Sequence, residues 1–209
     1  RYIFSKVGTT KDFTISYSSL SESWISEHSY QPNLFVSVNN NLFAINNDAT
    51  LSTMHEHNVG DYGSFYGAAI ANSELDLVFN KAAGVEKTWD NMKHYTISKD
   101  NNGIVQQFDC WDELRVYSDT RNTGWYNMIV TNAYGSKAVN NPTTEVRVRR
   151  NNNKFNLTSI FDVANQDPTA VFKPRIKGHQ VTANLVYENA DNYEFIVNFI
   201  STTFRYNAS

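Results

Sequence analysis

Apolar and polar residues alternate along much of the chain with a period of two, which places successive side chains on opposite faces of an extended strand. In residues 12–19, Phe13, Ile15 and Tyr17 alternate with Thr and Ser, and this pattern predicts a half-buried strand. The same reasoning predicts further strands at residues 24–30, 33–39, 41–46, 50–58, 73–81, 94–100, 112–119, 144–150, 154–161, 175–189 and 193–206.

The turns between these strands are rich in asparagine. Two apolar runs flank Asn39 and Asn40, and asparagine tolerates the left-handed backbone conformation that tight hairpins need, so we expect a hairpin there. Helical patterns are few: residues 85–94 favour a turn or two of helix, and residues 123–136 are ambiguous. The sequence therefore predicts an all-β protein with antiparallel strands.

The spacing of the strands divides the chain into two parts. Residues 1–72 have the rhythm of a propeller-blade-like β-meander, which we expect to continue an upstream propeller. Residues 73–209 have longer strands and longer links, typical of an antiparallel β-sandwich. The chain opens on Arg1 without a methionine, so we interpret it as part of a longer polypeptide.

Charge and cysteine content exclude several classes of protein. The net charge of the 209 residues is -3, which argues against a general nucleic-acid-binding surface. Cys110 is the one cysteine, so an intrachain disulfide and a cysteine-only metal site are both impossible. No apolar run approaches the roughly 20 residues that a membrane-spanning helix needs.

The histidines are the candidate metal ligands. His55 and His57 are two residues apart and share one face of a strand, and His28 from a neighbouring strand would add a third ligand. The alternative is that these rings close a strand by hydrogen bonding to turn backbone near Asn58. We expect this second role, and no cofactor.

A cluster of acids around an aromatic residue suggests carbohydrate chemistry. Asp109, Asp112 and Glu113 surround Trp111, which would serve as a stacking platform for a sugar. Acids this close in one segment are not the opposed pair, roughly 5–9.5 Å apart, that glycoside hydrolysis requires. Because no nucleophile, phosphate-binding or metalloprotease motif occurs either, we expect no enzyme.

Two short segments carry alternating basic residues. Arg147 and Arg149 form one stripe, and Lys173, Arg175 and Lys177 form the other, each on one face of a strand. Such stripes can contact DNA phosphates or acids of a neighbouring subunit, and the alternative is a solvated strand face. The negative net charge favours subunit contacts.

The residues together resemble a known family. The segments that carry the resemblance are Phe13 to Tyr17, Trp24-Ile25-Ser26-Glu27-His28-Ser29-Tyr30-Gln31-Pro32, Leu42-Phe43-Ala44, His57-Asn58, Phe65-Tyr66-Gly67 and the closing Phe172-Lys173-Pro174-Arg175-Ile176-Lys177-Gly178 hairpin. From about Phe13 to Tyr206 the chain is similar to the C-terminal part of the tail muzzle proteins, also called DNA-stabilisation proteins, of crAss-like short-tailed bacteriophages.

The resemblance implies a structural virion protein at the distal end of a tail. Copies would form a ring that closes the tail channel, retains packaged DNA and opens at genome ejection, with other tail proteins as partners and transient contact with viral DNA. Within this role Trp24 would supply buried area between strands. The candidate interface residues are Tyr62, Phe65, Tyr66, Trp125, Arg147, Arg149, Arg175 and Lys177. The alternative is a carbohydrate-binding β-sandwich, an adhesion module of a phage or bacterial surface protein, with Trp111 in its sugar site.

Overall fold

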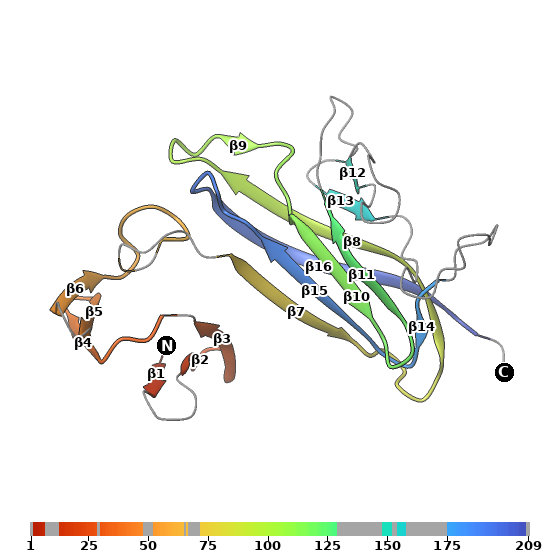
Figure 1. The fold of residues 1–209 in the computed structure, drawn as a ribbon, viewed down its shortest axis with the longest axis horizontal. Coiled ribbons are helices and arrows are strands. Elements are labelled where there is room, and N and C mark those ends of the chain that lie inside the picture. Colours follow the sequence, from red (N-terminus) through yellow and green to blue (C-terminus); the bar gives the residue numbers. More distant parts are fainter. Residues whose placement is uncertain are drawn as a thin grey trace. The chain divides into compact units, whose positions relative to one another are not determined.

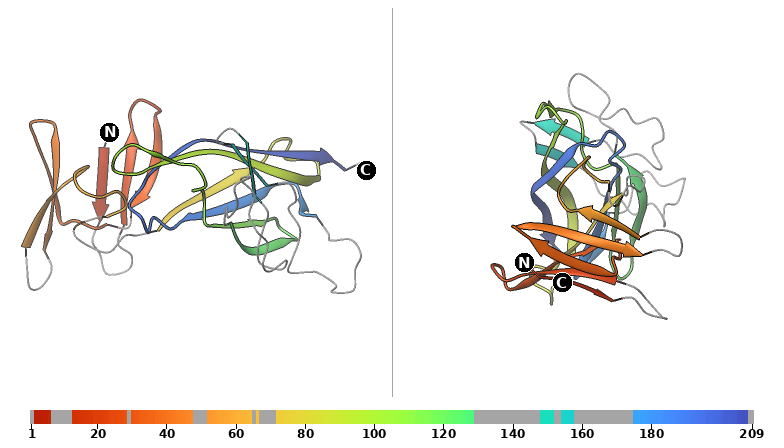
Figure 2. Two further views of the ribbon diagram at one scale, coloured as in Figure 1. Left: turned by 90° about the horizontal axis from the view of Figure 1, so that it is seen from above. Right: turned by 90° about the vertical axis from the view of Figure 1, so that its left-hand side faces the viewer.

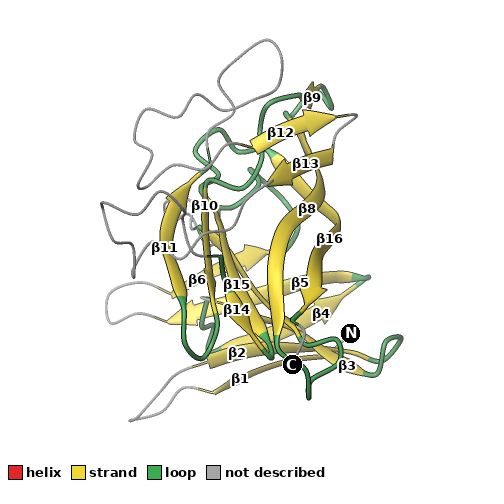
Figure 3. Cartoon of the chain, turned by 90° about the vertical axis from the view of Figure 1, so that its right-hand side faces the viewer, coloured by secondary structure: helices red, strands yellow, loops and turns green. Residues whose placement is uncertain are grey.

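The computed structural model describes residues 2–6, 13–28, 30–47, 52–64, 66, 72–128, 148–151, 154–157 and 175–207. Every regular element among them is a β-strand, and all pairings between strands are antiparallel (Figures 1 and 3). The all-β prediction is therefore confirmed. The chain divides into two compact units, Arg1–Ala69 and Ile70–Ser209, which we call the N-terminal and C-terminal units. No helix in the described residues is long and apolar enough to cross a membrane.

The N-terminal unit contains two three-stranded sheets, each a meander of consecutive strands. The first is β1-β2-β3, formed by Tyr2–Lys6, Phe13–Ser18 and Ser23–His28. The second is β4-β5-β6, formed by Leu34–Val38, Asn41–Asn47 and Ser52–Glu56. A propeller blade has four strands, whereas each of these sheets has three described strands.

The hairpin expected around Asn39 and Asn40 joins β4 to β5. Val38 pairs with Asn41, so the loop between the strands has two residues, and both have positive φ angles of 50° and 68°. Two consecutive left-handed residues make the turn that matches the twist of a β-hairpin, and asparagine adopts this conformation more readily than most residues. Asparagine thus takes the place of the usual glycine.

The C-terminal unit is a sandwich of two sheets. One has the order β11-β10-β15-β7, from Asn122–Asn127, Glu113–Tyr117, Val181–Tyr187 and Ser73–Phe79. The other is built around the long strand β8, Lys87–Lys99, with β12, β13, β14 and β9 at Val148–Asn151, Lys154–Leu157, Lys177–Gly178 and Val105–Gln106. Strand β16, Glu194–Tyr206, runs beside β8 along its whole length (Figure 2).

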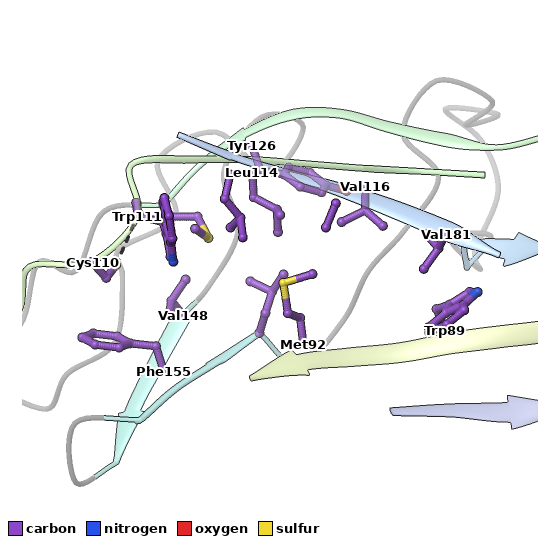
Figure 4. Close-up of a cluster of buried hydrophobic side chains, with 14 of the residues drawn as sticks. Trp89, Met92, Cys110, Trp111, Leu114, Val116, Tyr126, Val148, Phe155 and Val181 are labelled. Atoms are coloured by element: carbon purple, nitrogen blue, oxygen red, sulfur yellow. Dashed lines mark hydrogen bonds between the residues drawn. The ribbon is translucent and has the colours of Figure 1, made fainter. Parts of the chain in front are cut away.

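Side chains from both sheets meet in one hydrophobic core (Figure 4). Trp89, Met92 and Phe155 approach from the sheet around β8, while Leu114 and Val181 approach from the opposite sheet. All five are at most 2% exposed. This burial is the main stabilising contribution that the described residues show in the C-terminal unit.

Strand β8 corrects one prediction. Residues 85–94 favour a helical turn in sequence, but the structure places Lys87–Lys99 in a strand. The strand pairs with β16 through twelve residues, including Trp89 with Phe204, and with β13 on its other edge. Hydrogen bonds and core packing along both edges outweigh a weak local preference for helix.

The faces of two strands differ from what their hydropathy suggests. In β2, Thr14 and Ser16 are fully buried, while Phe13, Ile15 and Tyr17 are only partly so. In β8, the polar residues His94, Thr96 and Ser98 are buried, and the apolar residues between them are half-exposed. The period of two is correct in both strands, but the small or polar residues face inward.

Candidate functional site

One hollow among the described residues lies within the N-terminal unit. It is a hollow of about 940 Å³ that brings together the three histidines singled out in the sequence, His28, His55 and His57, with Tyr30 and Tyr66. His28 ends β3, His55 is in β6, and His57 follows β6 and donates its backbone N–H to Leu42 O at 2.8 Å. The strands therefore deliver all three rings to one place.

Each histidine has a hydroxyl within hydrogen-bonding distance of its Nε2. The distances are 3.0 Å from His28 to Ser16 Oγ, 2.9 Å from His55 to Thr53 Oγ1, and 3.0 Å from His57 to Tyr66 Oη. The sequence predicts bonds to turn backbone for these rings, whereas the described Nε2 partners are side-chain hydroxyls. These bonds fix the orientation of the rings.

Tyr30 is the centre of the cluster and is 8% exposed. Its ring stacks on His28 with centroids 4.7 Å apart, and it meets His57 and Tyr66 edge to face at 5.4 Å each. His55 contacts Tyr66 at 4.9 Å. Aromatic pairs in these geometries each stabilise by about 0.5–1.5 kcal/mol beyond their buried area, so the cluster ties together β3, β6 and the turn after β6.

Tyr66 occupies an unusual backbone position, with a φ of 55°. Burial, and then the neighbouring Tyr30, raises the pKa of the Tyr66 hydroxyl above its usual value. The hydroxyl therefore remains protonated at any physiological pH. A non-glycine residue holds such a backbone conformation only when its surroundings fix it, and here the contacts to His57, His55 and Tyr30 do so.

The three histidines do not form a metal centre in this structure. Among the described residues, no group of three His, Cys, Asp or Glu side chains has the arrangement to hold an ion. Tyr30 lies against both His28 and His57, and each Nε2 already faces a hydroxyl. The arrangement is suited to packing rather than to metal chemistry.

The acid cluster around Trp111 does not form a sugar site. Trp111 is 2% exposed and packs edge to face on Phe195 at 5.0 Å, so its ring is not accessible to a ligand. Asp109 accepts a 2.6 Å hydrogen bond from Tyr187 Oη, and Asp112 accepts one from the Glu188 backbone N–H at 2.7 Å. The expected stacking platform is part of the core, and its acids close loops.

The candidate interface residues have different environments. Tyr62 and Trp125 are 46% and 44% exposed, as an interface role requires, whereas Tyr66 is half-buried in the histidine cluster. Lys177 is half-buried in β14 opposite Thr88. Phe65 and Arg147 lie outside the described residues, as does the side chain of Arg149.

Arg175 forms an ion pair within the subunit. Its guanidinium donates to Asp90, which also accepts two hydrogen bonds from Arg205, from Nε at 2.8 Å and from a terminal nitrogen at 2.9 Å. Asp90 is the extra residue of a bulge in β8, between the pairs Thr203–Asn91 and Phe204–Trp89. The bulge thus holds a carboxylate between Arg205 of β16 and Arg175, which precedes β14.

Two buried ionisable residues in the C-terminal unit were not found from the sequence. Lys87 is fully buried, and its Nζ donates to the carbonyls of Ala82 and Val85, both at 2.8 Å. His94 is 1% exposed and stacks on Phe155 at 5.0 Å, and burial lowers its pKa to about 3. The alternation of apolar and polar residues along the strand does not indicate that either side chain faces the core.

Comparisons with known proteins add no identification. No protein-family model matches the chain, and no curated protein matches it.

Proposed function

We propose that this chain is a structural subunit of a virion, part of a ring at the distal end of a bacteriophage tail. In this role copies of the subunit close the tail channel, retain the packaged DNA, and separate or rearrange at genome ejection. The family resemblance of residues 13–206 suggests the role. One structural observation supports it: several large apolar side chains among the described residues of the N-terminal unit are exposed.

The uncovered surface is evident from the exposed fractions of large apolar side chains. Tyr30 and Ala44 are the buried hydrophobic residues among those described in the N-terminal unit. By contrast, Trp24 is 59% exposed, Met54 67% and Val59 69%. Trp24, expected to supply buried area, contacts Tyr17 edge to face at 5.3 Å but leaves more than half of its surface accessible. Where exposed apolar side chains gather in one patch, they are typical of protein contacts.

The sheet β4-β5-β6 arranges part of this surface in a row. Leu34 pairs with Ile45, and Ile45 pairs with Met54, so the three side chains lie directly opposite one another across the sheet. Leu34 and Met54 are 53% and 67% exposed. A row that crosses three strands forms one apolar strip that a neighbouring copy could contact. If the same contact repeats around a closed ring, the pressure of the packaged DNA is shared among identical interfaces.

A structural role is also consistent with how the reactive side chains are used. The three histidines face hydroxyls, the acids near Trp111 close loops, and Asp90 binds two arginines. In the alternative function, a carbohydrate-binding module, the sugar would need an accessible aromatic platform, and Trp111 does not provide one.

Electron microscopy and sedimentation of the purified chain test the proposal. We expect ring-shaped assemblies of the parent chain. The double variant Leu34→Asp/Met54→Asp places two charges on the apolar strip and should abolish the rings. Leu20→Asp is the matched control, because Leu20 lies in a turn of the same unit and is 97% exposed. The proposal is wrong if the parent chain forms no rings, either alone or on tail particles.

A further inference from the structure

Strand β16 has one long edge that pairs with no strand in the described part of the chain. Its Glu194–Tyr206 stretch pairs with β8 along one side. Figure 3 shows β16 at the margin of its sheet, beside β8. The backbone N–H and C=O groups on the other side of a strand in this position are available to a further strand.

The sequence of β16 lacks the usual protection of an exposed edge. Natural edge strands commonly carry charges along their length, as β7 does with Glu74 and Asp76, both exposed. In β16 the charges are confined to Glu194 and Arg205 near the two ends, and residues 195–204 between them are uncharged. An edge of this length without a central charge is suited to strand addition.

The side chains of β16 alternate between the core and the outer face of the sheet. Phe195, Ile200 and Phe204 pack against the core. Glu194 and Ile196 pair with Lys99 and Ile97 of β8 on the outer face. A bulge between Val197 and Phe199 moves the alternation by one residue, so the outward positions after it are Phe199, Ser201, Thr203 and Arg205.

We propose that β16 pairs with β16 of a second copy of this chain, antiparallel and around a two-fold axis. In an antiparallel pair, residues directly opposite must lie on the same face. The bulge makes this possible when Phe195 lies opposite Phe204 of the second copy, both facing the cores. In that register Ile196 lies opposite Thr203 of the second copy, both on the outer face.

The same register matches the charges. It places Glu194 opposite Arg205 of the second copy, and the two-fold axis repeats the pair at the other end. Moving one strand by a single residue would place the core-facing Phe195 opposite the outward Arg205, so that register is excluded. Glu194 also accepts from Lys99 at 3.3 Å, and Arg205 also donates to Asp90, so each pair would extend an existing network.

This contact is separate from the ring contact proposed above. A two-fold interface joins two copies and closes on itself, so it does not generate a ring. It uses β16 of the C-terminal unit, whereas the ring proposal uses the apolar strip of the N-terminal unit. The two proposals can therefore fail independently.

A pair of charge-reversal variants of the full chain tests the register. In a dimer of two Glu194→Arg chains, the introduced arginine of each copy would face Arg205 of the other. In a dimer of two Arg205→Glu chains, Glu194 of each copy would face the introduced glutamate of the other. Each variant alone should dimerise at least about tenfold more weakly than the parent. An equimolar mixture restores opposite charges at both ends, and only the mixed dimer should recover parental affinity in sedimentation equilibrium. Both variants carry Leu34→Asp/Met54→Asp, as does the parent used for comparison, so that ring contacts do not obscure the dimer.

Disulfide trapping gives a second measurement that does not depend on charge. Mixed Ile196→Cys and Thr203→Cys chains should crosslink on oxidation, because directly opposite Cβ atoms lie about 4.5–5.5 Å apart. Ile196→Cys mixed with Ser201→Cys is the control, since that pair is diagonal and roughly 7–8 Å apart. Cys110 is 3% exposed and is protected from reaction.

Three results would overturn the inference. The first is a parent chain that remains monomeric at all concentrations. The second is a charge-reversal pair whose mixture binds no better than the separate variants. The third is equal crosslinking of the opposite and diagonal cysteine pairs. Circular dichroism of each variant, matching the parent, excludes loss of the fold as the cause.

Discussion

The two units of the molecule use their aromatic and ionisable residues in different ways. In the C-terminal unit, Trp89, Trp111 and Phe155 are buried between two sheets, and even the ionisable side chain of His94 lies in the interior. In the N-terminal unit, an aromatic and histidine cluster around Tyr30 holds the strands together through ring contacts and hydroxyl bonds, and large apolar residues such as Met54 remain exposed.

The difference between the units lies in how much apolar surface their described residues bury. Burial of apolar surface is the largest favourable contribution to folding, and the described C-terminal residues supply it from their own two sheets. The described N-terminal residues supply much less, so a neighbour has more to add there. Under the proposed ring assembly, contacts between copies would stabilise the N-terminal unit more than the C-terminal unit.

The largest expected effect comes from matched leucine substitutions. Leu185 is fully buried in the core, and Leu185→Ala should lower the free energy of unfolding of the C-terminal unit by about 3 kcal/mol through lost burial and a cavity. Leu34 is 53% exposed, and Leu34→Ala should cost less than about 1 kcal/mol in the N-terminal unit. Native-state hydrogen exchange on dilute protein separates the two units. Equal losses would contradict the comparison.

Much of the strand pattern could be predicted from the sequence, because a period of two appears whenever one face differs from the other. The turn at Asn39 and Asn40 was also predictable, since few residues adopt positive φ so readily. Which face of each strand is buried could not be predicted from the sequence. In β2, Thr14 and Ser16 turn inward and Ser16 meets His28, because burial depends on which element packs on the strand.

The candidate site, too, could be predicted from the sequence only in part. Spacing predicts that His55 and His57 share a face, and the structure brings His28 to the same hollow. The sequence could not show that Tyr30 and Tyr66 would fill the space between these rings, because both contacts depend on the path of turns rather than on strand period. Trp111 likewise has an acidic neighbourhood in sequence, yet its position in the sandwich buries it.

An intermediate effect is expected from the pH dependence of the C-terminal unit. Burial holds the pKa of His94 at about 3, against 6.5 in the unfolded chain. Between these values the unfolded state binds more protons, so stability falls as the pH falls from about 6.5 toward 3, by about 1.4 kcal/mol per pH unit. Urea unfolding at pH 7 and pH 5 should show a loss of about 2 kcal/mol from this group. His94→Leu should lack this part of the slope, and an unchanged slope would contradict the assignment.

The smallest expected effect comes from removing the Tyr66 hydroxyl in the N-terminal cluster. Tyr66→Phe keeps the ring contacts with Tyr30 and His55 but removes the hydroxyl that lies 3.0 Å from His57 Nε2. Loss of one such bond should cost about 1 kcal/mol, because the imidazole nitrogen then loses its partner in a half-buried site. Exchange of the His57 backbone amide, which donates to Leu42, reports the local change, and exchange in β15 should not alter.

Tyr62→Phe is the matched control for this substitution, because Tyr62 lines the same hollow and is 46% exposed. Its hydroxyl can exchange a protein partner for water, so its removal should cost less than that of Tyr66. Equal effects of the two substitutions would mean that the hydroxyl of Tyr66 is no more important than any surface hydroxyl. A larger effect of Tyr66→Phe, confined to the N-terminal unit, would show that this unit depends on individual polar contacts where the C-terminal unit depends on its core.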